Sequence, residues 1–107
     1  METRRPDARG RAATRPTGVV LGEAFLASHA SGPPRHVHTR EDEGVIAASG
    51  ILTVHLGDQT HYVEQGGFAW MPRNVPHHFE NTGDEPVHGF GVIAPGGLDR
   101  FFAVREE

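Results

Sequence analysis

The sequence predicts an all-β protein, and three observations carry that prediction. Short runs of branched and apolar residues alternate with clusters of glycine, proline, asparagine and aspartate, which are turn signals. The turn signals recur at spacings of roughly 8–12 residues, as is typical of a β-sandwich or a closed barrel. No intervening segment is long or periodic enough for a crossover helix, which excludes a parallel sheet built from βαβ units.

The first half of the chain supplies its elements in a clear order. Residues 17–30 predict one or two strands, since branched and apolar residues there are interrupted by a glycine. Ser31-Gly32-Pro33-Pro34 is a turn by composition. Three more strands follow at 35–38, 44–48 and 51–56, separated by the polar segment 39–43 and by Ser49-Gly50.

The second half continues the same pattern and then changes period. Runs of branched and aromatic residues predict strands at 60–63, 68–71, 77–81 and 87–94. These strands are separated by turn segments at Gly57-Asp58, Gly66-Gly67 and the proline-containing stretches 72–76 and 82–86. Leu98, Phe101 and Phe102 recur at helical spacing, so we expect a short C-terminal helix packed on the outside of the barrel.

Length and charge define the domain organisation that we expect. A chain of 107 residues has room for one domain. Residues 1–16 hold five arginines against two acids, a net charge of +3, whereas the remainder carries −7. We therefore expect a disordered basic N-terminal tail over residues 1–16 and a β-barrel domain over 17–107. The acidity of that domain argues against a nucleic-acid partner, because it would repel phosphate backbones.

Composition also limits where the protein acts. The sequence contains no apolar run long enough to span a membrane and no secretory signal, so we expect no membrane partner. It contains no cysteine, so no disulfide can form and no thiolate can bind a metal. We expect a cytoplasmic protein.

Eight histidines are the unusual feature of the composition, and their placement indicates a metal site. His36 and His38 are two residues apart on an expected strand, so both imidazoles should point to the same face. The acid cluster Glu41-Asp42-Glu43 can deliver a carboxylate to the same spot. A third histidine comes from the distant pair His77-His78. This combination rarely arises by chance.

Only one member of the pair His77-His78 can face the interior, because neighbours on a strand face opposite sides. If His77 faces inward, Phe79 and Asn81 share its face, while His78 and Glu80 meet solvent. We expect the other histidines to be ordinary surface residues, namely His29, His55, His61 and His88.

These residues resemble the two sequence motifs of the cupin superfamily. The first motif corresponds to His36-Val37-His38, then Glu43 and Gly50, although its leading glycine is out of place. The second corresponds to Gly66, Pro72, Asn74 where glycine is usual, His77 and Asn81. The resemblance covers roughly residues 18 to 103 and is closest to small single-domain bacterial cupins of the type 2, quercetin-dioxygenase-like kind. It implies a double-stranded β-helix (jelly-roll) barrel whose metal ligands are His36, His38, Glu43 and His77.

Three imidazoles and one carboxylate suit one divalent ion of iron, manganese, nickel, cobalt, copper or zinc, without choosing among them. Open coordination positions beside a barrel interior favour a functional metal over a structural one. The resemblance then implies a metal-dependent enzyme, dioxygenase-like, acting on a small oxygenated or aromatic compound held in the barrel. Two alternatives stay open: a non-oxidative isomerase, cyclase or hydrolase, and a non-catalytic ligand-binding or sensory module. No catalytic residue other than the ligands stands out. We also expect a homodimer, since a small barrel exposes strand edges.

Overall fold

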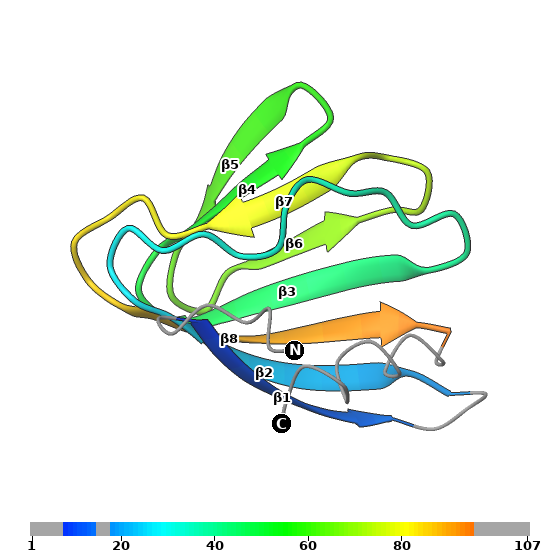
Figure 1. The fold of residues 1–107 in the computed structure, drawn as a ribbon, viewed down its shortest axis with the longest axis horizontal. Coiled ribbons are helices and arrows are strands. Elements are labelled where there is room, and N and C mark those ends of the chain that lie inside the picture. The colour runs from blue at the N-terminus through cyan, green and yellow to red at the C-terminus, as the bar shows by residue number, and fades with distance from the viewer. Residues whose placement is uncertain (1–7, 15–17, 96–107) are drawn as a thin grey trace.

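The chain folds into two antiparallel sheets that face each other (Figure 1). The computed structural model describes residues 8–14 and 18–95, of which 8–14 are described as backbone only. The strands run in the order β1 (Ala8–Thr14), β2 (Val20–Leu26), β3 (Asp42–Ser49), β4 (Leu52–Leu56), β5 (Gln59–Val63), β6 (Phe68–Met71), β7 (His77–Glu80) and β8 (Val87–Ala94). The expected all-β jelly-roll is confirmed. No helix in the described ranges is long and apolar enough to cross a membrane.

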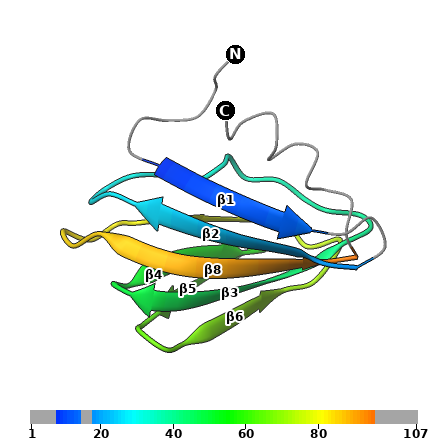
Figure 2. The same cartoon turned by 90° about the horizontal axis from the view of Figure 1, so that it is seen from below.

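One sheet has five strands and the other has three. The larger sheet has the order β1-β2-β8-β3-β6. Figure 2 shows these strands following one another from one edge of the sheet to the other. The smaller sheet has the order β5-β4-β7. Strands that are distant in the sequence are therefore neighbours, as in the pairing of β2 with β8 and of β4 with β7. This topology brings residues from both halves of the chain to one interior.

The core lies between the sheets and follows the two-residue period of the strands. Glu43, Val45 and Ala47 on β3 alternate inward, while Ile46 points out and is 44% exposed. Val54 of β4 and Met71 of β6 meet the same interior and are completely buried. Glu43 is the exception in this apolar row. A carboxylate in such a position needs partners, because an unpaired buried charge is costly.

Asn81 fastens the end of β7 to two other segments. It is 2% exposed, and its amide Nδ2 donates to the carbonyl oxygens of Leu26, Ala27 and Glu85 at 3.2, 3.1 and 2.7 Å. Its Oδ1 accepts a hydrogen bond from the Gly83 N–H at 3.0 Å. The side chain therefore holds the strand end and the turn after it in place.

The structure corrects two expectations at the N-terminal side. The predicted disordered tail over residues 1–16 is wrong for residues 8–14, which form β1 and pair along their whole length with β2. Backbone hydrogen bonds make this ladder, so it needs no hydrophobic periodicity. The segment 35–38 is not a strand either, because only His36 makes a single bridge, to His77. Pro33 and Pro34 precede it and have no N–H to extend a ladder.

The remaining strands were predicted with small boundary errors, and the limits at 68–71 and 87–94 match β6 and β8. The expected C-terminal helix lies outside the described residues.

Candidate metal centre

The loop between β2 and β3 crosses beside β7 and brings the first two histidines to the interior (Figure 1). His36 and His77 exchange both backbone hydrogen bonds: the His36 N–H donates to the His77 carbonyl at 3.0 Å and the reverse bond measures 2.8 Å. The loop is also fixed two residues later, where the Asn74 N–H donates to the His38 carbonyl at 2.7 Å. These bonds position the imidazoles although the segment is not a strand.

Glu43 and His77 reach the same place from opposite sheets. Glu43 is the second residue of β3, lies opposite Met71 and Ile93 on the neighbouring strands, and is 7% exposed. His77 opens β7 and is 1% exposed. The ligand atoms of His36, His38, Glu43 and His77 all lie within 4.8 Å of one another. The structure thus brings together the four residues that the sequence singled out.

The three imidazoles surround a common point. Their ring centroids are 4.8 Å apart for His36 and His38, 4.6 Å for His36 and His77, and 5.2 Å for His38 and His77. The first two pairs are tilted edge to face, at 79° and 64°. Rings arranged in this way can direct one nitrogen each toward a shared centre.

Backbone carbonyls fix which nitrogen of two rings is available. His36 Nδ1 donates to the Pro34 carbonyl at 2.7 Å, and His77 Nδ1 donates to the Val75 carbonyl at 3.1 Å. Because a carbonyl oxygen only accepts, both Nδ1 atoms carry the proton and Nε2 is left with its lone pair in the neutral ring. This second hydrogen bond is the usual way in which a metal-binding histidine is oriented.

The contact between His77 and Glu43 joins two atoms that both offer lone pairs. His77 Nε2 lies 3.0 Å from Glu43 Oε1. A neutral imidazole that donates from Nδ1 has no second proton for this contact, so it requires either an imidazolium or a cation between the two atoms. A metal ion would satisfy both lone pairs.

His38 gives stronger evidence that a cation would satisfy the lone pairs at this centre. Its Nε2 is fully buried and has no hydrogen-bond partner, although it lies 3.3 Å from Glu43 Oε1. Its Nδ1 is 3.7 Å from Glu41 Oε1. Buried polar atoms without partners are rare, because each costs about 1–3 kcal/mol. The orphaned nitrogen faces the carboxylate and the other rings, as a metal ligand would.

The pKa values of Glu43, His77 and His36 reflect how close these titratable groups lie to one another. Burial alone would raise the pKa of Glu43, but its contacts with His38 and His77 outweigh burial and lower that pKa from 4.5 to about 2. Burial lowers the pKa of His77, but hydrogen bonds to Glu43 and Val75 reverse the direction, so the pKa of His77 is raised. The pKa of His36 is lowered, mainly by burial. A carboxylate that stays ionised among imidazoles is the state that binds a cation.

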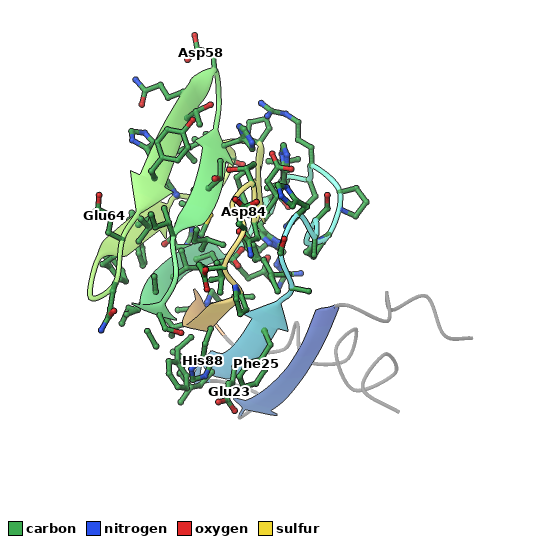
Figure 3. All side chains as sticks on the ribbon, turned by 90° about the vertical axis from the view of Figure 1, so that its left-hand side faces the viewer. Glu23, Phe25, Asp58, Glu64, Asp84 and His88 are labelled. Atoms are coloured by element: carbon green, nitrogen blue, oxygen red, sulfur yellow. The ribbon has the colours of Figure 1, made fainter. Side chains whose placement is uncertain are left out.

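Other polar residues take places outside this centre. Asp42 faces away from it and forms a two-pronged ion pair with Arg73, at 3.1 and 3.0 Å. His88 pairs with Glu23 at 2.8 Å and stacks on Phe25, and all three lie together on β2 and β8 (Figure 3). By strand alternation they lie on the outer face of the larger sheet, so His88 does not reach the centre.

The expectation that His78 and Glu80 simply meet solvent is wrong. His78 is partly buried and stacks on His55 with ring centroids 4.4 Å apart. Glu80 Oε2 lies 2.6 Å from His55 Nε2. The pKa of His78 is lowered by burial and by the positive charge that His55 can carry. Sequence reasoning missed this group, because the cross-strand register between β4 and β7 could not be deduced from the chain order.

Known proteins share part of this sequence and most of its fold. A family model described as a cupin domain matches residues 23–93. Protein SchB of Streptomyces halstedii is 35% identical over 63 residues, which cover 56% of this chain and 46% of SchB. The match therefore spans less than half of that relative.

Solved structures share the fold at low sequence identity. KdgF from Halomonas sp. superposes with a TM-score of 0.77 at 18% identity, covering 90% of this chain and 86% of KdgF. Oxalate oxidase in complex with the substrate analogue glycolate superposes with a TM-score of 0.70 at 17% identity, covering 88% of this chain and 55% of the oxidase. At such identities the likeness concerns the fold alone.

Proposed function

The chain belongs to the cupin family, and from this premise we propose that it is a metal-dependent enzyme acting on a small oxygenated or aromatic compound. One divalent ion would be held by His36, His38, Glu43 and His77. The observation that carries the proposal is the buried Nε2 of His38, which has no hydrogen-bond partner and lies 3.3 Å from an ionised carboxylate. A merely structural cluster would have satisfied that nitrogen.

The donor set defines the chemistry that the centre supports. Three imidazoles and one carboxylate suit borderline ions such as iron, manganese, nickel, cobalt, copper or zinc. When bound, such an ion supplies a Lewis acid with coordination positions left over for substrate and, for redox-active metals, electron transfer. Glu43 offsets one of the two charges of the ion, so the centre keeps a net charge of +1. That favours an anionic ligand such as a carboxylate, an enolate or a catecholate.

The surroundings strengthen the preference for an anion. Arg35 lies close enough to His77 to oppose its protonation, and its guanidinium is held by the Gly57 carbonyl at 2.7 Å. A fixed positive charge therefore lies near the centre. Oxalate oxidase, which shares the fold, was solved with glycolate, a small hydroxy acid. We therefore place dioxygenase-like oxidation of a small oxygenated anion first.

Oxygen uptake tests the proposal. Protein loaded in turn with iron(II), manganese(II), nickel(II) and copper(II) is offered small hydroxy acids, enolisable diketones and catechols in an oxygen electrode. We expect uptake with at least one pair of metal and substrate, and at least a hundredfold loss in the Glu43→Gln variant. Glu64→Gln serves as the matched control, because Glu64 is exposed in the turn between β5 and β6 (Figure 3).

Substrate turnover, followed in the same samples as oxygen uptake, separates the alternative functions. Turnover of a substrate without oxygen uptake, still lost in Glu43→Gln, would assign a non-oxidative isomerase or cyclase that uses the ion as a Lewis acid. Metal binding without turnover of any compound would contradict an enzyme and favour a ligand-binding module.

A further inference from the structure

A second cluster of side chains that could bind a metal lies on the outer face of the smaller sheet. His55 on β4 and His78 on β7 lie directly opposite each other in the antiparallel register. Glu80 is two residues further along β7, so it shares the face of His78. One ligand atom from each of the three residues lies within 4.8 Å of the other two. The paired backbones thus hold three suitable donors at one place.

The contacts in this cluster leave one nitrogen that could bind a metal without a hydrogen-bond partner. His55 Nε2 lies 2.6 Å from Glu80 Oε2, and the two side chains are only 25% and 28% exposed. The rings of His55 and His78 stack with an angle of 23° between their planes. His78 Nδ1 is buried without a hydrogen-bond partner. An ion pair between His55 and Glu80 accounts for the first contact but leaves this nitrogen unexplained.

Thr60 gives the cluster the second layer of support that metal sites usually have. It lies opposite His55 on β5, and its Oγ1 is 3.1 Å from His55 Nδ1. The hydroxyl oxygen can accept a hydrogen bond from Nδ1–H, which leaves the His55 Nε2 lone pair directed at the cluster. This orientation comes from a third strand, so the whole small sheet shapes the cluster.

We propose that His55, His78 and Glu80 form a second divalent metal site, suited to Zn²⁺ or Cu²⁺. Two imidazoles and a carboxylate match the ligand preferences of these ions, and at least one position is left for water or a ligand. Donors around a tetrahedral ion with bonds of roughly 2.0–2.2 Å stand about 3.4 Å apart. The contact between Glu80 and His55 must therefore widen, and the stacked rings must splay, both through side-chain rotation.

The two centres use opposite faces of one strand. His77 and His78 are adjacent on β7, so the first points to the interior and the second to the outer face. No residue is shared, and the outer site does not depend on the inner centre being filled. The proposal therefore stands apart from the proposed function.

Equilibrium dialysis of the full chain against Zn²⁺, followed by elemental analysis, tests the second site. Wild-type protein should bind two ions. His55→Asn and Glu80→Gln should each bind one, and Glu80→Gln can keep its hydrogen bond to His55 and so the fold. The control His61→Asn removes an exposed histidine of the same sheet and should bind two. Thr60→Val should weaken the second ion roughly tenfold.

A double variant of the inner centre, His36→Ala with His38→Ala, distinguishes the two proposals. It should keep one ion, and adding Glu80→Gln should abolish binding. If wild-type protein binds one ion that the inner double variant loses, the second site is refuted. Two ions retained in both His55→Asn and Glu80→Gln would refute it as well. A single ion that is lost only in the outer variants would support the second site and contradict the inner one.

Discussion

Replacing Glu43 by glutamine should weaken the metal-free protein in a way that depends on pH. The pKa of this carboxyl falls from 4.5 to about 2 on folding, and its side chain is only 9% exposed. A lowered pKa stabilises the fold fully above pH 4.5 and loses its effect as the pH falls toward 2. At about 1.4 kcal/mol per tenfold change, the carboxylate contributes roughly 3 kcal/mol at pH 6 and about 1 kcal/mol at pH 3.

Urea denaturation of metal-free protein measures this difference. The free energy of unfolding of Glu43→Gln is compared with that of wild type at pH 6 and at pH 3, where titrating groups that do not contact Glu43 cancel between the two proteins. We expect the loss at pH 6 to exceed the loss at pH 3 by about 2 kcal/mol. At pH 6 the raised pKa of His77 still keeps that partner protonated. An equal loss at both values would show that Glu43 is not held ionised by the histidines.

Four further outcomes follow from the structure. His38→Asn should lower metal affinity at least tenfold in a chelator competition, whereas His29→Asn, whose ring pairs with an exposed acid, should leave it unchanged. Asn81→Ala should lower the free energy of unfolding by about 2–3 kcal/mol, because buried carbonyls lose their donor; a change below 0.5 kcal/mol would contradict this. Gly50→Ala should cost about 2 kcal/mol or more in thermal unfolding, since Gly50 has a φ of 81° and a Cβ there would strike the Pro86 carbonyl. Sedimentation should show a concentration-dependent dimer, because large apolar side chains stand exposed on the outer face of the larger sheet; a monomer at all concentrations would contradict it.

The sequence predicted β2 to β8 because each of these strands carries its own local signal. Turn residues and apolar runs give β6 and β8 their limits without reference to other strands. The grouping of His36 and His38 was predicted for a reason that proved incomplete. Their rings do lie together, but a bridge to β7 and a loop hydrogen bond hold them, in place of a continuous strand.

Features that depend on pairing between distant strands could not be read in this way. β1 has no apolar period, and only its backbone ladder with β2 defines it. The group formed by His55, His78 and Glu80 depends on β4 lying beside β7, which chain order does not reveal. Residues that look like separate surface side chains in the sequence therefore become neighbours only through the register.

The reciprocal bridge between His36 and His77 has a consequence for how this protein can vary. Main-chain hydrogen bonds at Gly32 and His36 tie the crossing loop to β7, so the exposed neighbours Arg35 and Val37 can vary in side chain without breaking those bonds. We therefore expect substitutions at these two positions to leave the imidazole of His36 in place.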